Sequence, residues 1–317
     1  MKTGLTHTDQ ERFHFDIYAI LEGPQELYFG HETQVNVNVV ETVTIQIGDS
    51  DDDTIEKCYM SPTKRRGVER RTLIWAPVGN EMLGDQLNCG IPHTCSQEIC
   101  PICSVYGGLI TSKTSIDTGD GQKVERDATT LIGRLTHGGG TAIQPLDPEE
   151  KQRAMHPSKI HQGEKAEKIM PMPYKKEYNE PGLLYPVYNH CLSMTDKEFA
   201  SVAYAFLSVL PRIGAGNPKG VKILDYTMIS DQLEPVIVFD RYRIPLGKRP
   251  VISPQTTAVK QALDQFQQAT FSVSGQSQEP AGEINNGSFT RYVGDRAIQK
   301  LSEYLVAFEA EVLNTEN

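Results

Sequence analysis

Four of the six cysteines fall within fifteen residues, in the spacing Cys89-x5-Cys95-x4-Cys100-x2-Cys103. A tetrahedral zinc ion takes four thiolate or imidazole ligands, and the two-residue gap between Cys100 and Cys103 lets both sulfurs face one centre. Six cysteines are too few to build a chain of 317 residues on disulfides. The cluster therefore predicts a structural zinc site, which supplies folding energy to a segment that buries little apolar area.

The ligand set has alternatives. The five-residue gap is wide, so His93 could replace Cys89 or Cys95 as a ligand. Buried free thiols are the main alternative to zinc, and redox chemistry is a further one. A catalytic zinc would need an open coordination position and a nearby acid, for which Glu98 gives only a weak hint.

The chain is long enough for a substantial core. With 38% hydrophobic residues, it can bury roughly three quarters of its unfolded surface. Its length suits about two structural units or one elaborated domain. The N-terminus has no apolar signal segment, and no later stretch approaches the ~20 apolar residues that cross a bilayer. We expect a soluble, cytoplasmic protein without a membrane partner.

Charge is segregated along the sequence. The chain carries a formal charge of −10, which argues against adhesion to nucleic acid through a globally basic surface. Three windows are nevertheless basic: 57–75 has six cations and one acid, 212–222 has three and none, and 240–249 has four and one. An acidic body with basic stripes is what a track for single-stranded nucleic acid requires. Ordinary solvated faces are the alternative.

The pattern of residues predicts a mixed chain. β-Branched and aromatic runs predict strands at 13–21, 35–47, 183–194, 221–229 and 236–244. Helices are expected from Ser61-Pro62-Thr63, from the capping box Thr195-x-x-Glu198 to 210, at 256–270 and at 295–313. Strands and helices do not alternate regularly, so an α+β fold is favoured over a doubly wound parallel sheet. The polar stretch 111–181, which contains Gly138-Gly139-Gly140, is interpreted as a functional insertion or arm.

The glycine-rich loop 214–220 does not fit a nucleotide-cofactor motif. Lys219 precedes Gly220 and no hydroxyl follows, so it is not a P-loop. The loop also runs from a helix into a strand, the reverse of a dinucleotide-binding turn. Exposed N–H groups between flanking cations would instead suit a nucleic-acid phosphate. A simple helix end and turn is the alternative.

The run Lys64-Arg65-Arg66-Gly67-x-x-Arg70-Arg71 places several cations on one helix or turn. Guanidinium groups at such spacings can contact successive phosphates. A solvated face that balances the acidic run 49–53 is the alternative. The predicted RNA-binding residues are Lys64, Arg65, Arg66, Arg70, Arg71, Arg212, Gly214, Gly216, Asn217, Lys219 and Lys222.

Taken in order, these motifs resemble the RAMP superfamily, in particular the backbone subunit that polymerises along the guide RNA in class 1 CRISPR effector complexes. The resemblance is carried by an early strand and turn, the segment 59–71, the block 100–107 with sequence CPICSVYG, and a helix that runs into 214–220. The cysteines make the type I-D backbone the nearest subtype, with type IV as a close alternative.

The resemblance implies a modified ferredoxin-like (RRM) palm with an inserted zinc-finger-like subdomain and a thumb. The palm would comprise 1–75 and 182–317, the cysteine-rich finger 76–110 and the thumb 111–181. Met170, Met172 and Tyr174 could be wedges at the thumb tip, with exposed loop residues as the alternative. Zinc would be bound by Cys89, Cys95, Cys100 and Cys103.

The implied function is a non-catalytic one. Type III backbone subunits cut with an aspartate in the loop after the first strand, and residues 17–48 contain no Asp. The implied partners are crRNA, target DNA or RNA, head-to-tail copies of the chain and other subunits of the complex. Alternatives are a RAMP-type endoribonuclease that uses His14 or His31 as a base, and a zinc-stabilised interaction module.

Overall fold

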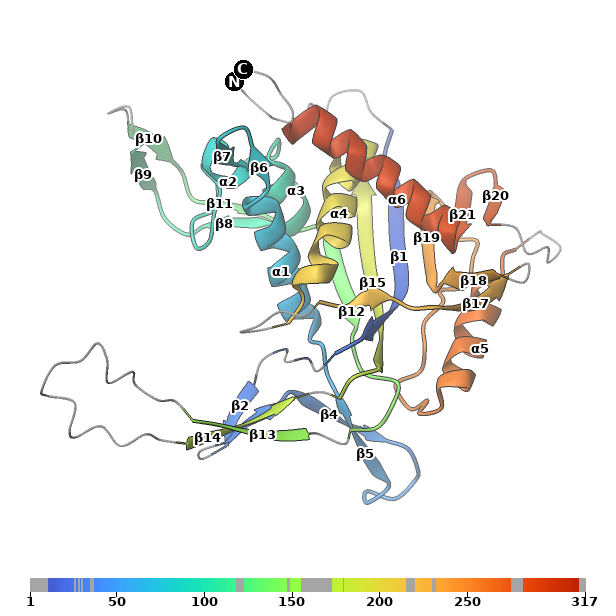
Figure 1. The fold of residues 1–317 in the computed structure, drawn as a ribbon. Coiled ribbons are helices and arrows are strands. Elements are labelled where there is room, and N and C mark those ends of the chain that lie inside the picture. Colours follow the sequence, from blue (N-terminus) through green and yellow to red (C-terminus); the bar gives the residue numbers. More distant parts are fainter. Residues whose placement is uncertain are drawn as a thin grey trace, which may run out of the picture.

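The computed structural model describes residues 11–25, 27, 29, 31–34, 37–117, 123–146, 149–154, 173–178, 180–214, 220–229, 232–274 and 282–313. Within this part of the chain, helices and strands are mixed, as the sequence predicts (Figure 1). Among the described residues, no helix has the length and apolar character that a membrane crossing needs.

A large antiparallel sheet forms the centre of the molecule. Its strands are ordered β12-β15-β1-β19-β21-β20, and the short β16 pairs with the end of β1. All neighbours in this sheet run antiparallel, so the prediction of an α+β fold is confirmed. The strands are β1 (Phe13–Gly23), β12 (Leu135–Gly139), β15 (Leu183–Met194), β16 (Lys222–Ile223), β19 (Ile237–Tyr242), β20 (Glu283–Asn286) and β21 (Phe289–Val293).

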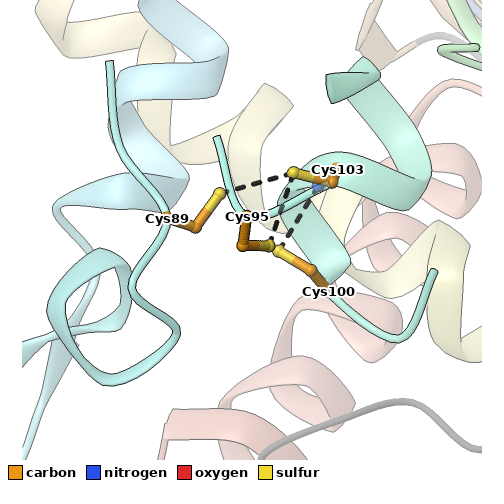
Figure 2. A group of neighbouring side chains, drawn as sticks. All are labelled: Cys89, Cys95, Cys100 and Cys103. Carbon is orange, nitrogen blue, oxygen red and sulfur yellow. Dashed lines mark hydrogen bonds between the residues drawn. The ribbon is translucent and has the colours of Figure 1, made fainter. Parts of the chain in front are cut away.

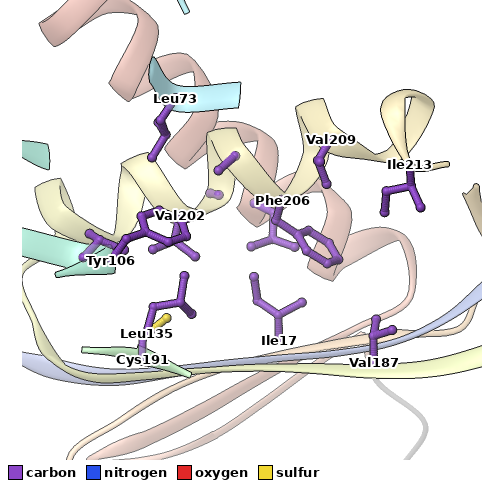
Figure 3. Packing of buried hydrophobic residues seen from close by; sticks show 14 of the residues in the cluster. Ile17, Leu73, Tyr106, Leu135, Val187, Cys191, Val202, Phe206, Val209 and Ile213 are labelled. Carbon is purple, nitrogen blue, oxygen red and sulfur yellow. The ribbon is translucent and has the colours of Figure 1, made fainter. Parts of the chain in front are cut away.

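Three helices cover one face of this sheet (Figure 1): α1 (Pro62–Ile74), α4 (Asp196–Val209) and α6 (Asp295–Phe308). Side chains from β1 and β15, including Ile17, Val187 and Cys191, pack against Val202 and Phe206 of α4 (Figure 3). On the other face, α5 (Val259–Thr270) packs against a second cluster of buried residues. The sheet is therefore buried on both sides over much of its length.

The ends of α1 and α4 differ. At α4, Thr195 accepts a hydrogen bond from Glu198 N and Glu198 Oε2 accepts one from Thr195 N, so the predicted capping box is confirmed. The helix is followed by a 3-10 turn, Leu210–Arg212. Helix α1 begins after Ser61 without a side-chain cap and ends at Trp75, which is 60% exposed. Helix α6 continues into a π-helical turn, Glu309–Leu313.

Smaller sheets surround this centre. A four-stranded sheet has the order β13-β14-β3-β2, and six strands form the hairpins β4-β5, β9-β10 and β17-β18. These strands are β2 (His31–Gln34), β3 (Val37–Val40), β4 (Thr42–Gln46), β5 (Thr54–Cys58), β9 (Thr114–Asp117), β10 (Lys123–Arg126), β13 (Glu149–Ala154), β14 (Pro173–Tyr178), β17 (Asp225–Ile229) and β18 (Gln232–Pro235).

The cysteine-rich region joins α1 to this periphery. It contains β6 (Pro77–Val78), β7 (Glu81–Met82), α2 (Leu83–Gln86), α3 (Pro101–Tyr106), β8 (Gly108–Ile110) and β11 (Thr129–Leu131). Strands β6 and β7 form a hairpin, and β8 pairs with β11. The region packs against α1 through α2 and α3, and β6 contacts the π-helical turn that continues α6 (Figure 1).

Three sequence expectations need adjustment. The run 35–47 is divided, because β3 pairs with β2 and β14 whereas β4 pairs with β5. The run 221–229 is divided at Leu224, because β16 pairs with β1 whereas β17 pairs with β18. The structure also divides 111–181, because β12 belongs to the central sheet while β13 and β14 belong to the four-stranded sheet.

Candidate nucleic-acid interface and metal centre

The predicted basic residues of α1 have different surroundings. Lys64 is exposed and forms an ion pair with Glu41. Arg66 is half-buried and donates to the carbonyl oxygen of Tyr106. Arg70 and Arg71 are also half-buried. The segment therefore does not present a continuous row of exposed cations.

Arg65 points into the protein. It is 3% exposed, and its Nη2 donates to Gly138 O at 3.1 Å and to Tyr188 O at 2.7 Å. Burial lowers the pKa of Arg65 to about 10, which leaves it charged at neutral pH. In this conformation its guanidinium holds α1 to the end of β12 and to β15 and is not available to a phosphate at the surface.

Glu69, one helical turn further along α1, is buried beside Arg65. Its carboxylate lies 2.6 Å from His137 Nε2 and accepts hydrogen bonds from Tyr106 and Asn189. Burial raises the pKa of Glu69, but His137, Arg65 and Asn189 together outweigh it and lower the pKa below its ordinary value. We refer to Arg65, Glu69, Tyr106, His137 and Asn189 as the α1 polar network. The charge pattern of the sequence did not reveal it.

The first turn of α1 favours an anion. Ser61 makes no side-chain cap, and no acidic residue lies in this turn. The N–H groups at the start of an α-helix lack intrahelical partners, and the helix dipole places partial positive charge there. Thr63 and Lys64 are both exposed at this end. The helix thus begins without a side-chain cap and with the exposed Lys64 in its first turn.

The segment 212–222 reaches the same end of the molecule. Helices α1 and α4 run antiparallel, so the start of α1 lies at the same end of the helical layer as Arg212 (Figure 1). Arg212 donates to Ser208 O, and Lys222 forms an ion pair with Glu22. Gly214 lies at the loop's start, and Gly220 at its end has φ +75. The predicted residues Gly216, Asn217 and Lys219 lie outside the described residues.

The four cations of the basic window 240–249 differ in whether they form ion pairs. Arg241 pairs with Asp196, and Arg243 pairs with Glu11. Lys248 and Arg249 are exposed. The structure thus brings Lys64, near the start of α1, and Arg212 and Lys222 to one end of the molecule, while part of the third window is paired with acids elsewhere.

The four cysteines of the cluster converge (Figure 2). Their sulfurs all lie within 4.8 Å of one another and all four residues are buried. Cys103 Sγ lies 3.4 Å from Cys89 Sγ and 3.6 Å from Cys95 Sγ. Two ligands of a tetrahedral zinc at ~2.3 Å each would be about 3.8 Å apart, so the cluster has the size of a zinc site.

Local structure explains this convergence. Cys100 caps α3, with its sulfur accepting from Cys103 N at 3.4 Å, so the two-residue gap becomes the first turn of the helix. Hydrogen bonds from Cys100, Cys89 and Cys95 lower the pKa of Cys103, whereas those from Cys103, Cys89 and Cys95 raise the pKa of Cys100. Cys103 is therefore the sulfur of this pair that favours the thiolate, the form that binds metal. His93 is exposed and is not among the converging ligands. The cysteines alone complete a closed set of four.

The predicted histidine bases and thumb-tip residues are only partly within the described part of the chain. His14 Nδ1 accepts a hydrogen bond from Ser193 N at 3.3 Å. His31 and Tyr174 lie in β2 and β14. Met170 and Met172 lie outside the described residues. The structure does not bring His14 together with the basic start of α1, because His14 lies at the opposite end of β1 from Gly23.

Comparisons with known proteins give remote structural similarity only. No protein-family model matches the chain, and no curated protein matches it. The crystal structure of Thermofilum pendens Csc2 aligns with a TM-score of 0.39 and 12% identity over 95% of this chain and 80% of that one. A type IV-B CRISPR complex aligns with a TM-score of 0.37 and 12% identity over 78% of this chain and 98% of that one. Similarity at this level establishes neither the family nor the function of the chain.

Proposed function

We propose that this protein is a non-catalytic backbone subunit of a CRISPR interference complex, which binds crRNA through sequence-independent phosphate contacts. Copies would associate head to tail along the guide, a heterologous contact that does not close and so produces a helical filament. Other subunits of the complex and target DNA or RNA are the further proposed partners. The guide would present its bases for pairing, while the protein contacts mainly its backbone.

The topology of the central sheet supports a ferredoxin-like palm. In chain order, β1, α1, β12, β15, α4 and β19 follow a β-α-β-β-α-β succession. Their strand order in the sheet is β12-β15-β1-β19, with all neighbours antiparallel and α1 and α4 on one face. This succession is the ferredoxin-like motif. Strands β21 and β20 and helix α6 would then be additions to it.

The single observation that carries the proposal is the end of the molecule at which α1 begins. An uncapped helix start with Lys64 lies at the same end as Arg212 and Lys222, which flank the glycine-rich loop (Figure 1). Backbone N–H groups and dispersed cations suit phosphates, which are contacted without regard to base sequence. The ion pairs of Lys64 and Lys222 with glutamates would open when a phosphate replaces the carboxylate.

RNA binding tests this proposal. The charge reversals Lys64→Glu, Arg212→Glu and Lys222→Glu together should weaken binding of single-stranded RNA at least tenfold, for any sequence. Each lost phosphate contact should reduce the slope of log K against log salt by ~0.7. Three reversals on α6 and its surroundings, Arg296→Glu, Lys300→Glu and Lys197→Glu, form the control with the same change of net charge. Equal loss of affinity in both variants would contradict an interface at the start of α1.

Absence of cleavage is part of the proposal. Purified protein incubated with labelled precursor RNA should leave it intact. Specific cleavage that disappears in His14→Ala would overturn the non-catalytic role and favour the endoribonuclease.

We further propose that the four cysteines hold one structural zinc ion. Burial of all four leaves no open ligand position, which favours a structural role over a catalytic one. Metal analysis should find one zinc per chain, and Cys100→Ser with Cys103→Ser should lose it and melt at a lower temperature. Cys58→Ser, a buried cysteine outside the cluster, is the control and should retain zinc. A metal-free wild-type protein of unchanged stability would contradict the proposal.

A further inference from the structure

A cavity of about 250 Å³ lies where β12 ends beside β15 and the loop before α5. Its wall includes Gly139, Thr141, Pro186, Tyr188, Ile252 and Ser253. Three separate parts of the chain therefore form it: the segment after the Gly138-Gly139-Gly140 run, the first half of β15, and the segment 252–256. None of these residues belongs to the predicted RNA-binding set.

The glycine run gives the cavity its shape. Gly139 has φ +73, a conformation that L side chains rarely adopt, and a Cβ there would collide with Pro186 O and lie 3.0 Å from Tyr188 Cε2. A side chain at this position would thus project against Pro186 and the Tyr188 ring, which both line the cavity. The ring itself is fixed, because Ile252 N donates to its hydroxyl at 3.0 Å. An immobile aromatic ring forms one wall.

The remaining wall is flat, apolar and neutral. Pro186, Pro254 and Ile252 supply apolar surface, and the hydroxyl residues Thr141 and Ser253 supply neutral hydrogen-bonding groups. None of the described residues that line the cavity has an ionisable side chain other than the Tyr188 phenol. The volume lies below the roughly 300–1,000 Å³ of sites for drug-sized ligands. Such a site suits one planar ring system whose edge carries donors and acceptors.

Two buried cations stand directly behind this wall. Lys57 is fully buried and its Nζ donates to the carbonyl oxygen of Thr256 at 2.7 Å. Arg65 donates to the carbonyl oxygen of Tyr188 and to that of Gly138. Among the described residues, Lys57 has no carboxylate partner. The charge of Arg65 is offset by the neighbouring carboxylate of Glu69, so of the two cations behind the neutral lining it is Lys57 that lacks a counter-charge within the described part of the chain. Its ammonium favours a ligand that carries negative charge outside the ring.

The cavity is adjacent to the start of α1. Gly140 accepts a hydrogen bond from Met60 N at 2.8 Å, and Thr141 pairs with Tyr59 in an isolated bridge. The wall of the cavity is thus bonded to the two residues that precede Ser61. A phosphate at the uncapped start of the helix would stand close to the residues that form this wall.

The geometry points to a binding site for a single nucleotide, with the base in the cavity against Tyr188 and the phosphate directed toward the start of α1. Stacking on an aromatic ring accepts any base, because every base has a π-face. The nucleotide is either free or one unit of a bound RNA, and in the second case the inference rests on the proposed function. No role in reading sequence is assigned to the site.

Photocrosslinking with 4-thiouridine tests this inference for a free nucleotide and for a nucleotide within RNA. The protein is irradiated with 4-thiouridine monophosphate in one arm and with a single-stranded RNA carrying one 4-thiouridine in the other. Mass spectrometry should find the adduct on Tyr188 or within 252–256 in at least one arm. Excess UMP should suppress the free-nucleotide adduct at least tenfold, whereas ribose 5-phosphate should not.

Two variants complete the experiment. Ser253→Phe places a large side chain in the cavity and should reduce the adduct at least tenfold. Thr141→Phe, at another lining residue, should have the same effect and serves as a second variant if Ser253→Phe folds poorly. Gly138→Ala is the control, since a Cβ there meets only ordinary contacts at 3.5 Å, and its adduct should stay within twofold of wild type. RNA that binds without any adduct in the cavity, or equal competition by ribose 5-phosphate, would overturn the inference. An adduct from the free nucleotide without any RNA binding would support the site and contradict the proposed function.

Discussion

Two arginines lie buried on opposite faces of the central sheet, and their surroundings differ. Arg291 makes five hydrogen bonds: two to the carboxylate of Asp240 at 2.7 and 2.8 Å, and three to the carbonyl oxygens of Lys248, Ala269 and Thr270. Arg65 makes two, both from Nη2. Its Nε and Nη1 have no partner among the described residues.

The difference indicates a structural role for Arg291, whereas Arg65 keeps hydrogen-bond donors that are not used. A guanidinium has five N–H donors, and Arg291 uses all of them to join β19, β21, α5 and the loop that precedes α5. In the α1 polar network, unpartnered buried atoms also occur on His137 Nδ1 and Asn189 Oδ1. Donors and acceptors are thus both unused there, next to the proposed interface. Binding at the start of α1 can therefore rearrange this network with the loss of few hydrogen bonds. A rearrangement around Arg291 would break up to five.

The largest effect is expected at the fully bonded site. Asp240→Ala would leave the Arg291 charge buried without a counter-ion, and breaking a buried pair in this way costs about 3–5 kcal/mol. Urea unfolding measured by circular dichroism checks this value. A loss below about 1 kcal/mol would remove the contrast with Arg65.

Glu69→Gln should cost somewhat less, about 1.5–3 kcal/mol, the range of hydrogen bonds to charged groups. Because the pKa of Glu69 is lowered in the folded protein, its contribution is present above its ordinary pKa and is lost as pH falls through the folded value. The stabilities of Glu69→Gln and wild type should therefore differ at pH 7 and converge as the pH falls below 4.5.

Asp240 provides the comparison for this pH dependence. Burial raises its pKa despite Arg291, so its contribution is present below the ordinary pKa and declines as pH rises through the folded value. Asp240→Asn should consequently keep the acid-dependent loss of stability that Glu69→Gln removes. The same loss in all three proteins would show that Glu69 is not its source.

Arg65→Met should have a smaller effect, about 1 kcal/mol or less. Burial is the largest influence on the pKa of Arg65 and is only partly offset by Glu69, so the substitution removes a desolvation cost together with two hydrogen bonds. Glu69 keeps His137 and Asn189 as partners, so its carboxylate is not left alone. Arg291→Met is the matched substitution and should cost more. Equal losses in the two variants would refute the distinction.

Lys57 extends the comparison to a buried cation with one hydrogen bond and no carboxylate among the described residues. Burial lowers its pKa to about 8. Lys57→Met should raise stability at pH 7 by of order 1 kcal/mol, since desolvation of the ammonium is removed. Wild-type stability should rise between pH 8 and about 10.5, where the unfolded chain binds more protons, and the variant should lack this rise. A destabilised variant at pH 7 would contradict the sign.

Much of the secondary structure follows from local sequence. The strand 183–194 has the bounds that its aromatic and β-branched residues predict, and the capping box of Thr195 and Glu198 begins α4 as expected. These features depend on neighbouring residues only. The convergence of the four cysteines also follows from spacing, because one turn of α3 brings Cys100 and Cys103 together.

The orientation of α1 could not be predicted in this way. Its core-facing residues include Arg65, Glu69 and Thr72, which have helical spacing but are polar. Apolar periodicity normally identifies the buried face of a helix, and here it is missing. Arg65 therefore looked like a phosphate ligand. The spacing of four between Arg65 and Glu69, which permits an ion pair on one face, was the available signal.

The glycine run was also uninformative from sequence alone. Gly138 and Gly139 lie in the edge strand β12, but glycine contributes no side-chain alternation by which a strand is recognised. Only the contacts with Met60, Pro186 and Tyr188 reveal why glycine is needed there.

Trp75, the only tryptophan in the chain, stands exposed where α1 meets the cysteine-rich region. Tryptophan fluorescence therefore reports on this one position, where the indole is exposed to water. If a neighbouring copy in the proposed filament covers Trp75, the spectrum should shift to shorter wavelength without any attached dye. The molecule thus carries its own optical reporter for assembly.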